Sequence, residues 1–371
     1  MRNVFRTYEI QLEVMEPLYI GCGQKVGKKE YVFLSKEKRV VVLNQQKLFH
    51  LLERKKLLSD YQKFMLGASK WDVGRWLESK RITSNEYLTC GQYEIDAGDA
   101  VEELRSKPGI EPFIKDVYGK PYIPGSSLKG MLRTILLAQN IMETENLYDD
   151  TRKTLKRTVP PDRYVYQRDA KSMEMKFYHN LQRVPKKQNA VNDFMSGVVI
   201  GDSEPLEVND LILCRRLKMY TDGKEKSLNV IRECIRPGTK VKFMLTIDTS
   251  KCHLDKKALQ QAISDFSEMY YQCFLKKFRF PRQEENSVWL GGGVGFVSKT
   301  EIYPLLGESQ GVDATIKVFK ETKVPWKHKH VQDKQLGVSP HICKIARYQG
   351  KLYQVGLCRI QIEEKNFSPE P

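Results

Sequence analysis

Residues 121–139 read PYIPGSSLKGMLRTILLAQ, and they form the best-defined element of the sequence. Pro124 and Gly125 interrupt the chain, after which the side chain of Ser126 or Ser127 can cap a helix. The apolar positions that recur at helical spacing are Leu128, Met131, Leu132, Ile135 and Leu136. The stretch therefore predicts an amphipathic helix that follows a sharp break in the chain.

Several strands are expected on either side of this helix. Residues 8–14 alternate apolar and polar side chains, and YVFL (31–34) and VVVL (40–43) flank a tetrad typical of a hairpin. Three later stretches also indicate strands: GVVIGD (197–202), LILCRRLKMY (211–220) and TKVKFMLTID (239–248). In the last of these, Val241, Phe243, Leu245 and Ile247 point to one side.

The remaining elements complete an α+β pattern. We expect helices at about 46–66 and about 255–277, and strands near 342–347 and 352–362. Strand and helix runs alternate twice, which predicts two domains of similar topology. An N-terminal domain would cover 1–250 with insertions, and a C-terminal domain would cover 251–371. The proline-containing segment at about 151–190 is expected to be a mobile basic insertion.

The charge of the chain favours a polyanionic partner. Lys and Arg number 62 against 46 Asp and Glu, a net charge of +16. The excess is localised, because residues 151–190 hold 11 basic and 3 acidic side chains and residues 314–359 hold 10 and 2. Two basic stretches suit a nucleic-acid backbone better than a uniformly solvated surface does.

Membrane and extracellular classes are not favoured. No run of about 18 apolar residues occurs, and the first residues alternate like a strand rather than forming a signal-peptide core. The eight cysteines are scattered without a CxxC pair, which fits free thiols in a reducing cytoplasm. We therefore expect a cytoplasmic protein with no membrane partner.

Two glycine-containing motifs are candidates for contact with a phosphate backbone. Gly125 opens the helix described above, and Lys129 and Arg133 lie four residues apart on its polar side, so the helix can be either a phosphate site or an ordinary capped helix. The second motif, GGGVGF, has glycine at 291, 292, 293 and 295, followed by Phe296 and Lys299. It can be a flexible turn or a place where another backbone approaches closely. FVSKTEIY (296–303) after it indicates a strand or loop.

Metal and catalytic chemistry are weakly indicated. His328, His330, His341 and Cys343 suggest a zinc site, but their spacing is not a standard one and the surroundings are rich in lysine. Asp202, at the end of a strand, is expected to cap the next turn. We therefore expect neither a bound metal nor a cofactor.

Three of these motifs together resemble a known family. YIPGSSLKGMLR (122–133), IGDSEP (200–205) and LGGGVGFVSKT (290–300) closely resemble the RAMP superfamily of CRISPR effector proteins. Within it, the fifth-subunit family of the type III-A Csm complex is the most similar. The resemblance covers nearly the whole chain, from the IGCG loop (20–23) to HICKIARY (341–348). The glycine-rich loop is its most specific part.

The resemblance implies a fold, a ligand and partners. The fold would be two tandem ferredoxin-like (RRM-like) RAMP domains with insertions. The chain would be a non-catalytic RNA-binding subunit of a type III-A CRISPR interference complex, bound to the 3′ region of the crRNA. There it would cap the filament of repeating backbone subunits and support crRNA maturation and antiviral defence. Its partners would be crRNA and the other Csm subunits, and a host trimming nuclease is a further candidate.

The resemblance also assigns residues. Gly21, Gly23 and Lys25 match the early glycine loop. The helix contributes Gly125, Ser126, Ser127, Lys129 and Arg133, and the late loop contributes Gly291, Gly292, Gly293, Gly295, Phe296 and Lys299. The backbone subunits of such complexes carry a catalytic Asp in the early loop. The loop GCGQKVGKKE (21–30) has none here, so that activity is not carried over.

An endoribonuclease is the alternative, because metal-independent enzymes that cleave pre-crRNA share the fold. Such chemistry needs a general acid and base, often histidine, beside a 2′-hydroxyl. Neither His50, in an apolar helix, nor His179, in the basic segment, is paired with a second catalytic group by the sequence pattern. Incubation of the protein with repeat-containing RNA in EDTA distinguishes the two hypotheses.

Overall fold

The structure, a computed structural model, describes residues 4–68, 70–104, 106–144, 146–157, 164–325 and 330–365. Its first sheet has five antiparallel strands in the order β10-β13-β1-β9-β6. The strands are β1 (Phe5–Val14), β6 (Val198–Ile200), β9 (Lys240–Asp248), β10 (Ser287–Trp289) and β13 (Leu357–Glu364). The predicted alternation of β1 is confirmed, because Tyr8, Ile10, Leu12 and Val14 are all buried.

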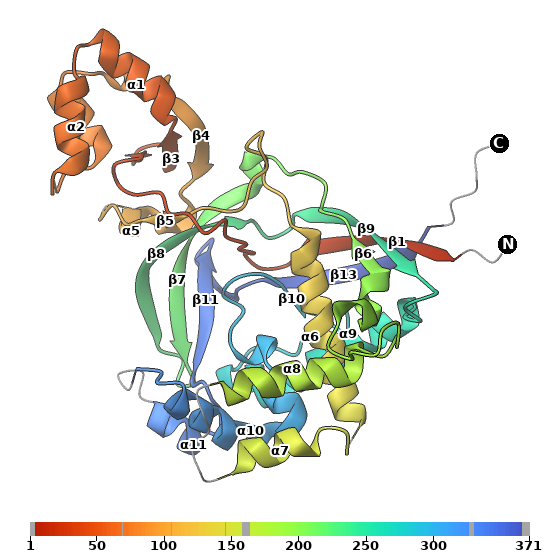
Figure 1. The fold of residues 1–371 in the computed structure, drawn as a ribbon. Coiled ribbons are helices and arrows are strands. Elements are labelled where there is room, and N and C mark those ends of the chain that lie inside the picture. The colour runs from red at the N-terminus through yellow and green to blue at the C-terminus, as the bar shows by residue number, and fades with distance from the viewer. Residues whose placement is uncertain are drawn as a thin grey trace, which may run out of the picture.

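Two long helices cover the inner face of this sheet (Figure 1). They are α6 (Gly125–Glu143) and α9 (Lys256–Cys273), which also pack on each other. The apolar face predicted for α6 is confirmed, with Leu128, Leu132, Ile135 and Leu136 buried. Asp255 caps α9 by accepting a hydrogen bond from the Ala258 amide. Both helices contribute to the main hydrophobic core.

The second sheet follows the order β12-β11-β7-β4-β3-β2, with β8 paired to β7 and β5 paired to β8. Strands β7, β8 and β11 form its curved wall (Figure 1). The bounds are β2 (Tyr31–Leu34), β3 (Arg39–Leu43), β4 (Gly91–Asp96), β5 (Ile110–Glu111), β7 (Leu211–Tyr220), β8 (Glu225–Ile235), β11 (Ile342–Tyr348) and β12 (Lys351–Gln354). The hairpin of β2 and β3 was predicted, whereas β8 was not.

A small unit with its own hydrophobic core projects from the body. It joins the β2–β3 hairpin to α1 (Gln45–Arg54), α2 (Leu58–Leu66), α3 (Val73–Ser79) and α4 (Ser84–Leu88). The prediction of a single helix at 46–66 is therefore wrong in one respect, because the structure has two helices there. The chain breaks between α1 and α2, where Lys56 adopts a left-handed φ of 56°.

The remaining helices are α5 (Val101–Leu104), α7 (Asp149–Lys156), α8 (Val165–Tyr178), α10 (Ile302–Glu321) and α11 (Asp333–Leu336). Of these helices, α7, α8 and α10 lie on the α6 side of the body, whereas α5 lies near β5 and α11 packs on α10 (Figure 1). Two of them, α7 and α8, fall in the basic segment 151–190. They bury Leu155, Met173 and Tyr178 in the main core. The mobility of that segment stays a prediction, and Pro160 and Pro161 lie outside the described residues.

Two local predictions near the C-terminus were wrong. FVSKTEIY forms a short 3₁₀ turn (Val297–Lys299) and the start of α10, instead of a strand or loop. The strand expected at 352–362 is split at Gly356, whose φ is 79°. There β12 ends and β13 begins, and the two strands join different sheets. A side chain on Gly356 would collide with the Leu290 carbonyl, so the crossing requires glycine.

Strands from both sides of residue 250 meet in each sheet. In the first sheet β13 pairs with β1, and in the second β11 pairs with β7. The division into domains 1–250 and 251–371 stays a prediction.

All eight cysteines are unpaired, and seven of them are buried. None of the helices in the described part of the chain combines the length and apolar character needed to cross a bilayer.

Candidate nucleic-acid interface

Three of the predicted motifs meet at one depression, which we call the glycine pocket. It encloses about 500 Å³ between the early loop, the start of α6 and the glycine-rich loop. Its lining residues are Ile20, Gly21, Ser126, Ser127, Gly130, Met131, Thr134, Trp289, Leu290, Gly291, Gly292, Ser298 and Lys299. The structure thus brings together residues that the sequence places about 280 positions apart.

Backbone contact between two loops forms the floor of the glycine pocket. The Gly292 amide donates a hydrogen bond to the Tyr19 carbonyl at 2.7 Å. A Cβ on Gly291 would lie 2.3 Å from that carbonyl oxygen, and Gly291 has a positive φ of 88°. Gly291 is therefore required by the fold. Gly292 has no positive φ, and it lines the pocket.

The N-terminus of α6 is closed by a protein carboxylate. The helix begins at Gly125 and not after Ser126 or Ser127, because the Gly125 amide donates to Asp202 Oδ1 at 2.8 Å. Asp202 thus has the capping role expected of it, but it caps a helix distant in sequence. The two serines remain at the edge of the pocket.

Lys129 and Arg133 contact protein groups on the side of α6 that faces residues 193–198. The Lys129 ammonium donates to the carbonyls of Met195 and Val198, at 2.8 and 2.7 Å. Arg133 pairs with Asp193 at 2.7 Å and lies over the Tyr178 ring. Both cations are therefore part of the packing of α6, and neither lines the glycine pocket.

The other predicted residues lie around the pocket rather than in it. Gly23 turns the early loop with a φ of 81°, and the Lys25 side chain packs over Gly109. Gly293 and Gly295 have φ values of 108° and 110°. Phe296 packs edge-on against Phe319 and faces a neighbouring cavity.

Lys299 lies at the edge of the glycine pocket with much of its side chain exposed. Burial lowers the pKa of its ammonium below the ordinary lysine value. No carboxylate among the described residues forms an ion pair with it. A lysine at the edge of a pocket without a carboxylate partner favours an anionic ligand.

A row of lysines crosses the second sheet near this pocket. Lys218 on β7 is directly opposite Lys344 on β11 and Lys226 on β8. We call these three residues the lysine row. Directly opposed like charges destabilise a sheet. Arg216, two residues before Lys218, adds a fourth cation to the same face.

No carboxylate in the described part of the chain pairs with the lysine row. Burial and then the charges of Arg216 and Lys226 lower the pKa of Lys218. The pKa of Lys344 is also lowered, by desolvation and then by cations that include Arg216 and Lys299. Lys299, at the edge of the glycine pocket, is thus close enough to Lys344 for its charge to act on the lysine row.

Arg232 ties this basic face to the glycine-rich loop. Its guanidinium donates to the Gly292 carbonyl at 3.2 Å, pairs with Glu111 at 2.6 Å and lies over the Tyr19 ring. Arg232 therefore holds the loop in position beside the basic face.

Sequence reasoning did not identify Arg216 or the lysine row. The signal was present in LILCRRLKMY, where Arg216 and Lys218 alternate with apolar residues. Alternation predicts which face they share, but not the strands beside them. Only the pairing of β7 with β8 and β11 places Lys226 and Lys344 beside Lys218.

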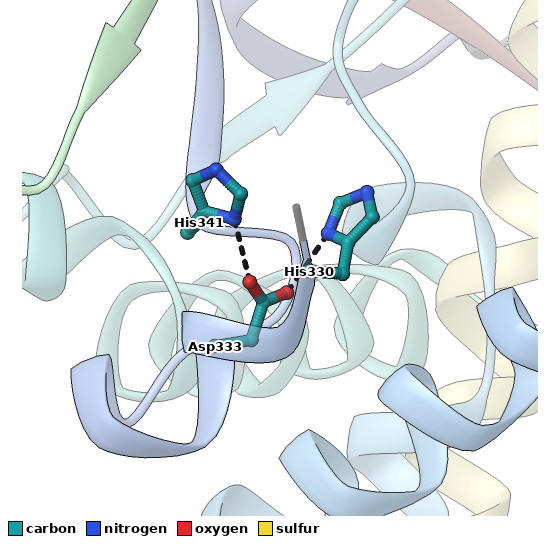
Figure 2. Close-up of side chains that lie close together, drawn as sticks. All are labelled: His330, Asp333 and His341. Carbon is teal, nitrogen blue, oxygen red and sulfur yellow. Dashed lines mark hydrogen bonds and ion pairs between the residues drawn. The ribbon is translucent and has the colours of Figure 1, made fainter. Parts of the chain in front are cut away.

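A histidine cluster lies at the end of this sheet (Figure 2). Asp333 accepts hydrogen bonds from Nδ1 of His330 at 3.0 Å and Nδ1 of His341 at 2.5 Å, and from the Ser339 hydroxyl at 2.6 Å. These bonds hold the pKa of Asp333 below its ordinary value, even though burial opposes that shift. Of the residues suspected as zinc ligands, His330 and His341 converge and His328 lies outside the described residues.

His330, Asp333 and His341 are a donor set that could hold a metal, with ligand atoms within 4.8 Å of one another. Cys343 is not part of the group, and Asp333 was not foreseen as a member. The three hydrogen bonds already satisfy Asp333, and they tie α11 to β11.

Comparison with known proteins gives consistent matches. The family model of the RAMP superfamily matches residues 11–298. The Csm5 protein of Mycobacterium tuberculosis is 26% identical, over 98% of this chain and 99% of its own length. The Csm5 protein of Streptococcus thermophilus is also 26% identical, over 81% of both chains.

Two solved structures share the fold. A chain in a cryo-EM structure of a Csm–crRNA–target RNA ternary complex of a type III-A CRISPR-Cas system has a TM-score of 0.65 at 19% identity. It covers 95% of this chain and 100% of its own. A crystal structure of Csm5 from T. onnurineus has a TM-score of 0.57 at 16% identity, covering 94% and 99%.

Proposed function

The chain belongs to the RAMP superfamily, and from this premise we propose that it is the RNA-binding Csm5 subunit of a type III-A CRISPR complex. One observation carries the RNA-binding part. The lysine row and Arg216 hold four cations on one sheet face without a carboxylate partner among the described residues. A phosphate backbone would neutralise them.

The proposed role at the crRNA 3′ end rests on the similarity to Csm5 proteins and to a chain of a Csm–crRNA complex. Csm5 proteins match this chain over nearly its full length, and one chain of similar fold comes from a complex that contains crRNA and target RNA. We propose that the crRNA 3′ region binds along the glycine pocket and the lysine row. At that end the chain would cap the filament of repeating backbone subunits and support crRNA maturation. The proposal includes a cytoplasmic location, the other Csm subunits as partners and a trimming nuclease as a further one.

For the site, we propose that Gly21, Ser126, Ser127, Gly292 and Lys299 contact RNA directly. The other residues assigned from the resemblance would support them: Gly23, Lys25, Gly125, Lys129, Arg133, Gly291, Gly293, Gly295 and Phe296. This division follows from which side chains line the pocket and which already bond to protein groups.

We also propose a ferredoxin-like description of the first sheet. Elements β1, α6, β6, β9, α9 and β13 follow one another as βαββαβ, and the four strands lie in the order β13-β1-β9-β6. Such a unit would use both ends of the chain. A second unit would be built around β7, β8 and β11.

The proposal excludes catalysis, and an assay tests that part. His341 lies near the lysine row, because it stacks on Tyr220 of β7, yet it is only 5% exposed. A buried imidazole bonded to Asp333 cannot reach a 2′-hydroxyl without rearrangement. Repeat-containing RNA should stay intact with the purified protein in EDTA, and site-specific cleavage would favour the endoribonuclease instead.

The sharpest test of RNA binding replaces charges in the lysine row. The double variant Lys218→Gln, Lys344→Gln should bind single-stranded RNA more weakly. The slope of log affinity against log salt should fall by about 1.4, because each lost phosphate contact removes about 0.7. Its free energy of unfolding should rise by roughly 0.2–1 kcal/mol, because the opposed charges are gone. Affinity and stability thus move in opposite directions.

A matched control removes the same charge elsewhere. Lys36 and Lys47 are exposed and lie in the projecting unit. The double variant Lys36→Gln, Lys47→Gln should keep the salt slope of the unchanged protein. Equal losses in the two double variants would mean that only net charge matters, and the assigned RNA path would then be withdrawn.

A further inference from the structure

The glycine pocket opens toward a second cavity, which we call the side cavity. It encloses about 310 Å³ and is lined by residues of α6, α7, α8 and α10 and of the segment before α10. Thr134 and Lys299 line both spaces, so the two are neighbours along α6. The sequence motifs did not indicate this cavity, because α7 and α8 come from the basic segment.

The walls of the side cavity are mostly apolar. They include Leu137, Leu155, Met173, Phe296, Ile302 and Val318. Apolar walls with a few polar groups are the usual composition of a site for a small organic group, and such sites start at about 300 Å³.

Two carboxyl groups in this cavity have an oxygen without a partner. Glu301 Oε2 and Asp169 Oδ2 are both shielded from solvent and accept no hydrogen bond. Buried polar atoms are nearly always hydrogen-bonded, so two unsatisfied acceptors in one cavity indicate that the occupant brings N–H or O–H donors. Glu174, a third acid in the lining, is already paired with Arg133.

The electrostatics favour a neutral occupant over a strongly cationic one. Burial, and then the nearby charge of Glu174, raise the pKa of Glu301 to about 8. Burial also raises the pKa of Asp169. A carboxyl group that is protonated near neutral pH both donates and accepts a hydrogen bond. That pattern complements the edge of a nucleobase.

We propose that the side cavity receives one unpaired base of the bound RNA. The edge of the base meets the carboxyl groups of Glu301 and Asp169 between the apolar walls, and Lys299 at the mouth contacts the adjoining phosphate. The inference rests on the proposed RNA-binding function and deepens it, because it adds a base-selective position to a path that otherwise contacts phosphates.

The experiment uses single-stranded RNA oligonucleotides that carry 2-aminopurine at one position at a time. The fluorescence of this base depends on whether it stacks on its neighbours. One position should change fluorescence on binding in a way that its neighbours do not. Met173→Trp, on α8 and outside the glycine pocket, should abolish that change while the RNA remains bound.

Two further variants keep the test decisive. Ala170 is exposed and lines the side cavity from α8, so Ala170→Trp fills the same space without disturbing α6. Glu301→Gln keeps the shape of the side chain but removes its acidic group. It should reduce the preference for the native base over an abasic residue at the responding position by about 10-fold, which is within the range for one good polar contact to a base. Glu143→Gln, on the exposed end of α6, is the charge-matched control.

The outcomes separate the two proposals. If RNA binds with its salt dependence but no position responds, or the response survives both tryptophan variants, the base site is wrong and the RNA-binding function stands. If the unchanged protein binds no RNA, both fail. If spermidine raises the melting temperature and Glu301→Gln removes that effect, the cavity holds a cation and the base proposal is overturned.

Discussion

At the scale of single residues, the glycines of the glycine-rich loop fall into two kinds: those that the backbone conformation requires and one that the proposed RNA contact requires. We expect Gly291→Ala to lower stability by more than about 2 kcal/mol, because it adds a clash with the Tyr19 carbonyl to an unfavourable φ. Gly295→Ala, with a φ of 110° but open space around it, should cost about 1–2 kcal/mol. Thermal melting of each variant measures both effects.

Gly292→Ala should behave differently. Its Cβ would meet only the Tyr19 ring, at 3.1 Å, and its backbone tolerates a side chain. We expect a small change in melting temperature together with weaker RNA binding, since Gly292 lines the glycine pocket and the methyl group presses on the Tyr19 ring beside it. An RNA defect that only follows the loss of stability across all four glycines would limit the loop to a structural role.

Glu301 predicts a pH effect on stability. Its pKa is about 8 in the folded chain against 4.5 in an unfolded one, so the folded state holds more protons between these values. Stability contributed by this group is therefore lost as pH rises from about 4.5 through 8. Glu301→Gln should raise the melting temperature at pH 8, by the equivalent of roughly 1–3 kcal/mol, and by less at pH 5.5. An equal gain at both pH values would contradict the assignment.

At the scale of single residues, the sequence identified candidate RNA-contacting residues, but it did not predict which groups each of them bonds to. Gly21, Ser127 and Gly292 were candidates, and they do line one pocket. The partners of Lys129 could not be predicted, because Met195 and Val198 offer backbone carbonyls that leave no trace in the residue pattern. Helical periodicity predicts on which side of a helix a residue lies, but it does not predict which loop packs against that side.

At the scale of elements, Lys129 and Arg133 hold α6 against residues 193–198. Because the sequence places Lys129 and Arg133 on the polar side of the helix, it predicts that the double variant Lys129→Ala, Arg133→Ala costs little stability. The structure changes that expectation, because the substitutions remove two hydrogen bonds to the Met195 and Val198 carbonyls and the ion pair with Asp193. We expect a loss of roughly 2–4 kcal/mol, measured by denaturant unfolding.

Arg133→Lys is the control for this pair, since it keeps the charge but loses the planar contact with Tyr178. It should recover part of the stability. Full stability of the double alanine variant, combined with loss of crRNA from the assembled complex, would instead support a direct phosphate role for both residues.

Strands and helices with a strong period were predictable, and short or split ones were not. The alternation in β9 and the helical spacing in α9 identified both elements. By contrast, α10 begins in FVSKTEIY, whose β-branched and aromatic residues favour a strand. Packing against α6 and α9 overrides that local preference.

At the scale of the whole molecule, the two ends of the chain depend on each other. Residues of β1 and β13 pair along seven consecutive positions, from Tyr8 with Glu364 to Val14 with Cys358. The fragment 1–250 would lose β13 from one side of β1, and the fragment 251–371 would lose β1 from one side of β13. We therefore expect neither fragment to melt cooperatively alone, and co-expression to restore a folded complex. Cooperative melting of isolated 1–250 would support a domain boundary at residue 250.

The pairing of distant strands is the part of the fold that one sequence cannot reveal. An α+β class follows from the alternation of elements, whereas the neighbours of a strand depend on contacts over hundreds of residues. The lysine row illustrates this limit, because its three members come from strands that only the folded sheet brings together.

The same row has a consequence for how long copies of the protein persist in a cell. Opposed ammonium groups store repulsion in the free chain, and RNA bound to the native state relieves it. On the proposed function, a copy without RNA therefore spends a larger fraction of its time unfolded than a copy within the assembled particle. Proteases act on unfolded chains, so they remove orphan copies first. On the proposed function, the lysines that bind the crRNA therefore also make the unbound protein easier to degrade. The number of subunits that survive would then follow the amount of RNA.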